Sequence, residues 1–338
     1  MENKVIDLQE FNMSDEELFS YVDNNKLESE KITAPRYSYW KSVFRVFFRD
    51  KINIILLSVL LLVIVFAYIY PMCITYDPTA NISDLTAQHL TPSQAIDKYG
   101  FSIHYILGTG ASGEPTFDAI WTGARISISL ALVCAAINMT VGIVVGAIWG
   151  FSKKVDKFMT EVYNIIGNVP TILFISVMVM IMSASFWTLV FAMTITGWLF
   201  IAYFIRTQVI IIRDREYNLA SKCLGTPIFR IAMRNILPFM TSIIVTLAAT
   251  EIPSYISSEV FLSYIGIGLS ETSLGKLIQS TNSTMFVPGW ELEFWAPVTV
   301  TAIITIVLYV VGQKLGDASD PRTVSYTHLR AHETLANL

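Results

Sequence analysis

Apolar residues in this chain are gathered into long runs, and the shorter segments between the runs hold most of the charge. Each long run can cross the hydrocarbon core of a bilayer, which takes about 20 residues of α-helix. Helices are expected because they satisfy their own backbone hydrogen bonds in lipid. The pattern predicts an all-α polytopic membrane protein whose six spans cover residues 52–74, 126–150, 159–182, 187–212, 237–262 and 294–311.

Composition agrees with a membrane protein. Of the 338 residues, 53% are hydrophobic and 15% are charged, and the mean hydropathy is +0.54. Soluble domains carry about 25% charged residues, and a soluble protein would leave these apolar runs exposed. The three cysteines, Cys73, Cys134 and Cys223, form neither a disulfide framework nor a Cys-x-x-Cys metal pair.

The placement of lysine and arginine predicts the orientation of the spans. With six spans and both termini in the cytoplasm, the outer segments keep only Lys98, Lys276 and Arg125. The opposite orientation would invert this bias, so residues 77–117 are expected outside the cell. The basic residues expected on the cytoplasmic side, besides those of residues 213–236, are Lys41, Arg45, Arg49, Lys51, Lys153, Lys154, Lys157, Lys314 and Arg322.

The polar segments divide the chain into four parts. Residues 1–35 are rich in acidic side chains and predict a cytoplasmic tail. Residues 36–120 comprise a basic, aromatic stretch, the first span and the extracytoplasmic loop. Such a stretch is typical of a helix along the membrane surface, either an elbow that orients the bundle or a simple anchor. Residues 121–323 form a core of five spans, and residues 324–338 follow it.

Two carboxyl groups lie within the fifth predicted span, where an ionisable side chain is costly and is therefore a functional candidate. Glu251 and Glu259 could line a pathway or gate, or they could form structural hydrogen bonds between helices. Pro253 lies between them, and Pro170 lies in the third span. Each proline is expected to interrupt its helix, because neighbouring protein or a wet cavity can supply the missing hydrogen bonds.

Glycines predict a close contact between spans. Gly142 and Gly146 lie four residues apart in the second span, so both face the same side of that helix. Without side chains they let another helix approach closely, so packing is their expected role.

The motifs predict no nucleotide or metal site. The Gly275-Lys276 pair resembles the end of a phosphate-binding loop, but Ser270 stands in place of the first glycine. His328 and His332 have helical spacing but lack a third ligand. We therefore expect no cofactor, no metal and no catalytic residue in this chain.

The segment of residues 213–236 is charged although it lies between two apolar runs. It is therefore predicted to be a polar cytoplasmic loop, in which Gly225 follows a first loop helix and, free to take a positive φ, turns the chain sharply into a second. Its order of a Glu-Tyr pair, two small residues, a glycine and a Leu-Pro pair resembles the coupling loop of bacterial ABC-importer permeases. The residues that carry this resemblance are Glu216, Tyr217, Ala220, Ser221, Gly225, Arg234, Leu237 and Pro238.

Further motifs extend the resemblance from about Tyr39 to Arg322, to the second membrane permease of oligopeptide ABC importers, the OppC/AmiD type. Where that family has Glu-Ala-Ala, this chain has Leu219-Ala220-Ser221, so Glu216 is the acidic residue expected to serve instead. The further motifs are Leu107-Gly108-Thr109, Gly123-Ala124-Arg125-Ile126-Ser127, Thr196-Gly197-Trp198 with Arg206, the run from Glu259 to Gly268, Gly316-Asp317-Ala318 and Asp320-Pro321-Arg322.

The resemblance implies the type I ABC importer permease fold, with six transmembrane helices and cytoplasmic termini, in the bacterial plasma membrane. It also implies an ATP-driven oligopeptide importer, in which this chain forms half of the pathway and is not an enzyme. The implied partners are a homologous second permease, two ABC ATPase subunits that hold ATP and magnesium, an extracytoplasmic peptide-binding protein, the peptide and membrane lipid, but no nucleic acid. Residues 213–236 would contact the ATPases.

Two alternative functions stay open. Permeases for dipeptides or nickel chelates share the quoted motifs, so the motifs do not fix the cargo. An ion-coupled secondary transporter would need buried acidic or histidine relays within internal repeats, and it would leave residues 213–236 without a role. Residues 324–338 match nothing in the family and are interpreted as foreign or artefactual sequence.

Overall fold

The computed structural model describes residues 39–79 and 81–319. The described residues from Trp40 onward belong to one compact unit. The predicted acidic tail (residues 1–35) and the predicted foreign segment (residues 324–338) lie outside the described residues, as do His328 and His332. Within the described ranges the regular structure is helical, and the only strand-like pairing there is an isolated bridge between Thr109 and Pro115.

Four of the described helices are long and apolar enough to cross a membrane, and counting each of two bent pairs as one span gives six. Their bounds follow the predicted apolar runs, except that the second helix starts ten residues earlier and the last ends seven residues later than predicted. The four are α3 with α4 (Lys51–Tyr68 and Tyr70–Cys73), α6 (Thr116–Phe151), α9 (Phe186–Arg213) and α15 (Glu291–Ala318).

The two bent pairs have their breaks at or beside prolines. Helices α7 (Lys153–Gly167) and α8 (Thr171–Met182) meet at 74°, and Pro170 lies between them, as predicted. Residues 228–239 and α13 (Thr241–Tyr264) meet at 69° just after Pro238. Residues 228–239 hold three short helices, α11 (Ile228–Ile231), the π-helix η4 (Ala232–Ile236) and α12 (Leu237–Phe239).

The predicted interruption at Pro253 is wrong, because α13 continues through this residue. A proline inside a helix leaves the carbonyl four residues earlier without its amide donor, here the carbonyl of Ala249. Gly312 of α15 packs directly on that turn, so close that an added Cβ would lie 2.2 Å from the Cβ of Ala249. Pro253 itself is buried. Packing against α15 therefore supports the weakened turn, and the helix stays continuous.

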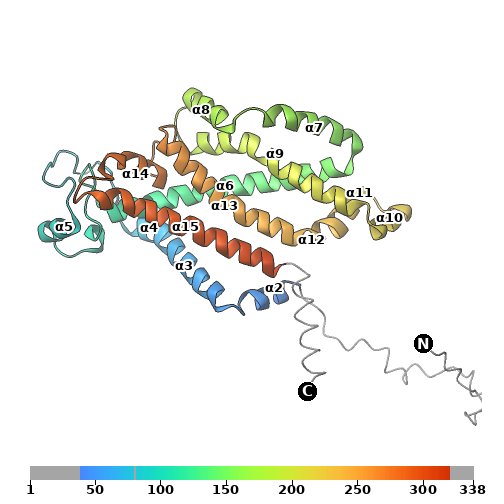
Figure 1. Cartoon of the computed structure of the whole chain (residues 1–338), viewed down its shortest axis with the longest axis horizontal. Helices are drawn as coiled ribbons and strands as arrows, with labels where there is room; N and C mark the ends of the chain where they lie inside the picture. Colours follow the sequence, from blue (N-terminus) through green and yellow to red (C-terminus); the bar gives the residue numbers. More distant parts are fainter. Residues whose placement is uncertain (1–38, 80, 320–338) are drawn as a thin grey trace, which may run out of the picture. The chain divides into compact units, whose positions relative to one another are not determined.

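Apart from α2, which precedes α3, the remaining helices lie at the two ends of the bundle (Figure 1). Helices α5 and α14 lie at one end, beside the segment between α4 and α6, whereas α10 lies at the other end with α11. The short helices are α2 (Tyr39–Phe47), α5 (Pro92–Tyr99), η3 (Ile103–Tyr105), α10 (Glu216–Cys223), α14 (Leu274–Ser280) and η5 (Asn282–Thr284).

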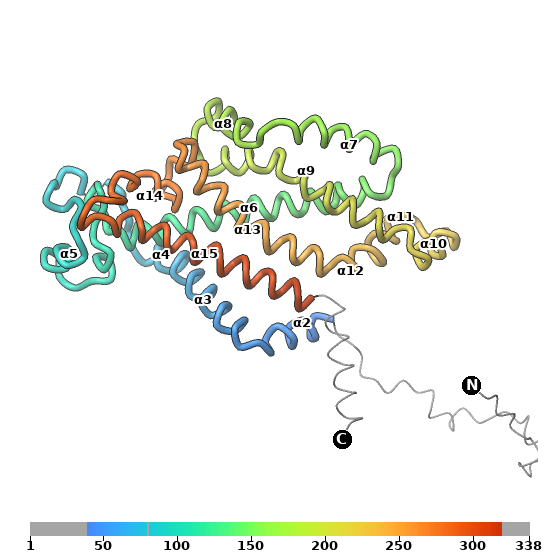
Figure 2. The backbone as a smooth tube through the Cα atoms, in the orientation of Figure 1, coloured from blue at the N-terminus to red at the C-terminus, as the bar shows by residue number. Residues whose placement is uncertain are grey.

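Helices α6 and α9 form a closely packed pair (Figure 2). Gly142, Gly146 and Gly150 form a stripe along α6, spaced by four residues. A Cβ at Gly146 would lie 2.5 Å from the carbonyl oxygen of Ala202 and 2.8 Å from the Cβ of Ile205. Glycine is therefore required here by the approach of the α9 backbone, and the predicted packing role of Gly142 and Gly146 is confirmed.

We expect Gly146→Ala to destabilise the fold by about 1–3 kcal/mol, because the new methyl group meets backbone that cannot move without shifting α9. The matched control is Gly167→Ala, at the end of α7, where an added Cβ meets nothing within 4 Å. Thermal unfolding of the two variants in the same detergent measures the difference. Equal melting temperatures would show that the α6–α9 contact tolerates a side chain.

Candidate functional site

We call residues 213–238 the coupling segment. It leaves α9 at Arg213 and folds into α10, a turn, α11, η4 and the start of α12, so most of the predicted loop is helical. Ile231 and Ile236 are buried, in one apolar cluster with Ile205 and Val209 of α9. Burial of these apolar side chains stabilises the segment, whose polar composition would not hold it against the bundle. It therefore explains why short helices form here.

Two side chains form hydrogen bonds at the junction of α9 and α10: Arg213 is the last residue of α9, and Asn218 lies on α10. The Arg213 guanidinium donates to the carbonyl oxygen of Gly150, at the end of α6. Asn218, with 1% of its surface exposed, donates from Nδ2 to the Ile212 carbonyl at 2.9 Å and accepts from Asn235 Nδ2 at 3.1 Å. The sequence analysis missed Asn218 and Asn235, because nothing local distinguishes them from ordinary loop residues.

The opposite face of α10 is exposed. Glu216, Tyr217 and Ala220 all point to solvent along it. Glu216 lies in the first turn and Lys222 in the last, which complements the helix dipole. The Ser221 hydroxyl donates to the Tyr217 carbonyl at 2.9 Å, so it is already used within the helix. The exposed face thus combines a carboxylate, an aromatic ring and a small side chain.

Gly225 turns the chain after α10, as predicted. Its φ is +77°, and the Thr226 amide donates to the Ser221 carbonyl at 3.1 Å while the Gly225 amide donates to the Lys222 carbonyl at 3.0 Å. These two bonds form a Schellman motif, whose C′ residue favours glycine. An added Cβ would meet nothing within 4 Å, so a substitution here is opposed by backbone conformation and not by crowding.

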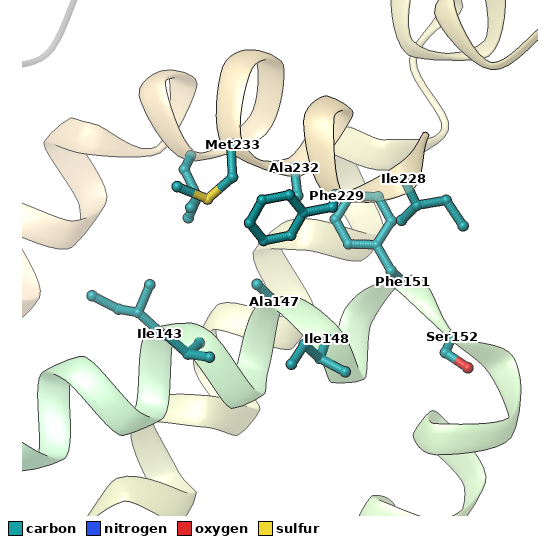
Figure 3. A pocket seen from close by; sticks show the side chains of 11 residues that line it. Ile143, Ala147, Ile148, Phe151, Ser152, Ile228, Phe229, Ala232 and Met233 are labelled. Atoms are coloured by element: carbon teal, nitrogen blue, oxygen red, sulfur yellow. The ribbon is translucent and has the colours of Figure 1, made fainter. Parts of the chain in front are cut away.

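The other predicted coupling residues lie beyond this turn. Arg234 is exposed on η4, and Pro238 is exposed on α12. Leu237 lines an apolar groove of about 510 Å³ between the C-terminal part of α6 and the α11–α12 region (Figure 3). The predicted coupling residues are therefore divided between α10 and the η4–α12 region, on either side of the turn at Gly225. Their coupling role stays a prediction. The groove is lined by Ile143, Val144, Ala147, Ile148, Phe151, Ser152, Ile228, Phe229, Ala232, Met233 and Leu237.

Charged side chains surround the inner side of α10. A polar pocket of about 270 Å³ there is lined by Lys153, Arg213, Asp214 and Lys222, among others. Arg215 lies over the ring of Phe239, with its Cζ 5.3 Å from the ring centroid. The start of α7 and the coupling segment thus share one end of the bundle and its basic residues.

The predicted pathway residue Glu259 has the contacts of the interhelical alternative. It is fully buried, with 0% of its surface exposed. Its carboxylate accepts hydrogen bonds from Ser127 of α6 at 2.8 Å, from Ser263 at 2.8 Å and from Ser273 at 2.7 Å. The Ser127 hydroxyl also accepts from the Leu274 amide at 3.1 Å. Glu259 therefore joins α13, α6 and the start of α14.

Glu251 lies one turn before Tyr255 on α13, so both share a face of that helix. The Tyr255 hydroxyl accepts a hydrogen bond from Asn138, a fully buried residue of α6. Asn138 also donates to the Met193 carbonyl of α9 at 3.4 Å. The structure thus places Glu251 beside a polar contact between three helices, and a pathway role for Glu251, Pro253 or Glu259 stays a prediction.

Two histidines attach the segment between α4 and α6 (residues 74–115) to the bundle. His89 Nδ1 lies 2.8 Å from Glu293 Oε1 of α15, and the His89 ring stacks on Trp290 with centroids 4.0 Å apart. His104 Nδ1 lies 2.8 Å from Asp118 Oδ2 of α6, and Tyr70 donates to Asp118 Oδ1 at 2.5 Å. No sequence signal pointed to these pairs, because their members are far apart in the chain or in unrelated motifs.

Glu114 also lies in the segment between α4 and α6. It lines a small cavity together with Glu293 and Thr116. Burial raises the pKa of the Glu114 carboxyl, and the Ser112 amide, which donates to its Oε2 at 2.8 Å, opposes part of this rise. The segment between α4 and α6 is thus held to helix ends by hydrogen bonds.

We expect Glu259→Ala to destabilise the fold by about 3 kcal/mol, because three buried hydroxyls lose their acceptor. Glu259→Gln keeps one acceptor oxygen and should lose less. Glu271→Ala is the matched control, because Glu271 is exposed and lies just before α14. Hydrogen exchange of residues 274–280 and thermal unfolding measure the effect. If the Glu259→Ala variant unfolds at the same temperature as Glu271→Ala and its residues 274–280 exchange hydrogen equally slowly, the Glu259 carboxyl group does not stabilise the position of α14.

Comparison with known proteins places this arrangement. Residues 142–325 match the family described as "Binding-protein-dependent transport system inner membrane component", and residues 38–92 match "N-terminal TM domain of oligopeptide transport permease C". The oligopeptide transport system permease protein AmiD of Streptococcus pneumoniae is 42% identical over 313 residues, which cover 91% of this chain and 98% of that protein.

Two Bacillus subtilis proteins are also similar. The oligopeptide transport system permease protein OppC is 32% identical over 310 residues, covering 90% of this chain and 97% of that protein. The dipeptide transport system permease protein DppC is 28% identical over 317 residues, covering 93% and 95%. The chain therefore belongs to the binding-protein-dependent transport system inner-membrane component family, as a multi-pass peptide ABC permease of the OppC/AmiD type in the bacterial plasma membrane.

Proposed function

We propose that this chain is the permease subunit of an ATP-driven oligopeptide importer, in which it forms half of the translocation pathway and couples to separate ATPase subunits. The observation that carries the proposal is the attachment of α10. Asn218 fixes one face of this helix to the last turn of α9 and to η4, Arg213 joins that end of α9 to the end of α6, and the opposite face of α10 is exposed. A helix held in this way can transmit a displacement from a docked partner to the bundle.

The exposed face of α10 suits a groove on an ATPase. Ala220 is small enough for close approach, and the Glu216 carboxylate can pair with a basic group of the partner. Tyr217, with 44% of its surface exposed, offers an aromatic anchor of the kind enriched at interfaces. These three side chains support docking of a partner at this end of the bundle.

The mechanism is alternating access. ATP binding would close a pair of ATPases, carry α10 with them, and shift the helices between inward and outward openings. No bond of the peptide changes, so this subunit has no catalytic role, and ATP and magnesium belong to the ATPases. The other partners are a homologous second permease and an extracytoplasmic peptide-binding protein.

Oligopeptides are the cargo favoured by the comparisons. AmiD and the Bacillus subtilis OppC, both named for oligopeptide transport, are 42% and 32% identical to this chain, whereas the Bacillus subtilis DppC, named for dipeptide transport, is 28% identical. The OppC of Haemophilus influenzae is 27% identical, so the preference rests on AmiD. Both names describe peptides, so the two kinds of cargo share their chemistry. The length of the peptide is the part of the proposal that uptake of defined peptides would test.

Six spans with cytoplasmic termini complete the proposal. Each bent pair then counts as one span. Lys153, Arg213 and Lys222 line one pocket at the same end of the bundle, as a cytoplasmic excess of basic residues requires. Helix α5 lies at the opposite end and would be extracytoplasmic.

Labelling tests this topology. We expect a cysteine at Ser93, on α5, to react with a membrane-impermeant maleimide in intact cells, and Cys223 to react only after permeabilisation. Both positions are exposed, so a difference reports the side of the membrane and not burial. The background should carry Cys73→Ser, because Cys73 is also exposed. Labelling of Cys223 but not of position 93 would invert the topology.

Two substitutions test the coupling role. Ala220→Arg places a long charged side chain on the docking face, and Gly225→Val strains the left-handed turn by about 1–2 kcal/mol. We expect both variants to insert normally, to lose at least about tenfold in ATPase co-purification, as 1.4 kcal/mol of binding energy implies, and to lose peptide uptake.

Ser93→Arg is the matched control, because it adds the same side chain to an exposed helix at the opposite end. It should leave ATPase co-purification unchanged. Normal assembly and normal uptake in both coupling variants would show that α10 is an ordinary solvated helix.

A further inference from the structure

Helix α2 carries an exposed ladder of aromatic rings. Trp40, Phe44 and Phe48 follow one another at four-residue intervals, and the Phe48 amide donates to the Phe44 carbonyl at 2.9 Å, which continues the helical spacing past the end of α2. Consecutive ring centroids are 6.4 Å apart, and each residue exposes 46–50% of its surface. Val43 and Phe47, on the adjacent face, are buried. The ladder is therefore an ordered surface feature and not part of the core.

A basic stripe runs beside this ladder. Lys41, Arg45 and Arg49 each follow a ring residue by one position, which places them about 100° further around the helix. All three are exposed, and none forms an ion pair in the described part of the chain. The neighbouring acid, Asp50, accepts from the Ile52 amide at 3.0 Å and lies 4.0 Å from Lys314 Nζ. Among the residues that the structure describes, the three cations thus have no acidic partner.

The surface next to α2 is apolar and uncovered. Helix α3 follows directly, and only 17% of its apolar window is buried by the rest of the molecule. Ile52, Ile55 and Leu62 each expose more than half of their surface. In a membrane protein such a surface faces acyl chains, so α2 lies where the acyl region meets the headgroups.

We propose that α2 is a binding site for anionic phospholipid headgroups. The rings of the aromatic ladder would lie at the boundary of the acyl region, where such rings are favoured. The ammonium of Lys41 and the guanidinium groups of Arg45 and Arg49 would hold lipid phosphates, and arginine can do so through two parallel hydrogen bonds. A polybasic surface beside a membrane span attracts anionic lipid in this way. The proposal depends on the membrane location of the chain and not on the coupling role of α10.

The test uses the full chain in vesicles that contain brominated phosphatidylglycerol or brominated phosphatidylcholine. Bromine quenches nearby tryptophan fluorescence, and the difference between the wild type and Trp40→Phe isolates the signal of Trp40. We expect quenching of Trp40 to favour phosphatidylglycerol, with a preference that weakens as salt rises. The triple variant Lys41→Gln, Arg45→Gln, Arg49→Gln should lose this preference, by about fivefold for each cation removed.

The matched control is the triple variant Lys153→Gln, Lys154→Gln, Lys157→Gln, which removes the same charge from the exposed start of α7. It should keep the preference at Trp40. Single substitutions on α2 should each remove part of the preference, which guards against a folding defect in the triple variant.

Three results would overturn the proposal. Equal quenching of Trp40 by both lipids in the wild type at low salt would show that the cations select no headgroup. Loss of the preference on adding inorganic phosphate at constant ionic strength would make the ligand a free anion. A preference that appears only after residues 1–35 are deleted would assign the cations to the acidic tail.

Discussion

The close approach of α6 and α9 is the contact on which the rest of this permease depends. Lipid tails are as apolar as the helix surfaces, so burial alone gives helices little reason to associate in a bilayer, and tight packing must do so. Gly142, Gly146 and Gly150 bring the α9 backbone against α6 over two turns. Because α9 leads directly into α10, this contact also determines where the coupling segment starts.

A second constraint is that polar groups buried in a membrane protein must find partners inside it. Glu259 satisfies this rule with three serine hydroxyls from three elements, and the Asn138 amide nitrogen donates to Tyr255 and to a carbonyl of α9. Both sets of bonds join helices that are distant in sequence. The same groups that look like candidates for transport chemistry in the sequence therefore also hold the helices in register.

The sequence predicted the helical spans because lipid allows little else, and it predicted the break at Pro170 and the turn at Gly225 because both depend on local backbone chemistry. It failed at Pro253, where a distant glycine, Gly312, brings α15 against the weakened turn. It also missed the pairing of His89 with Glu293, 204 residues away. These features depend on contacts that no local pattern records.

The attachments of α10 determine what a force on it would move. Asn218 bonds to the last turn of α9 and to Asn235 of η4, and Arg213 bonds to the end of α6. A displacement of α10 would therefore act on α6 and α9 together, since their glycine-mediated contact leaves no room for sliding. The bends before α8 and α13 lie outside this pair, at prolines that have already interrupted the hydrogen-bond ladder. Rotation about these two bends costs fewer backbone bonds than deforming α6 or α9, so the bends are where relative motion of the helices is cheapest.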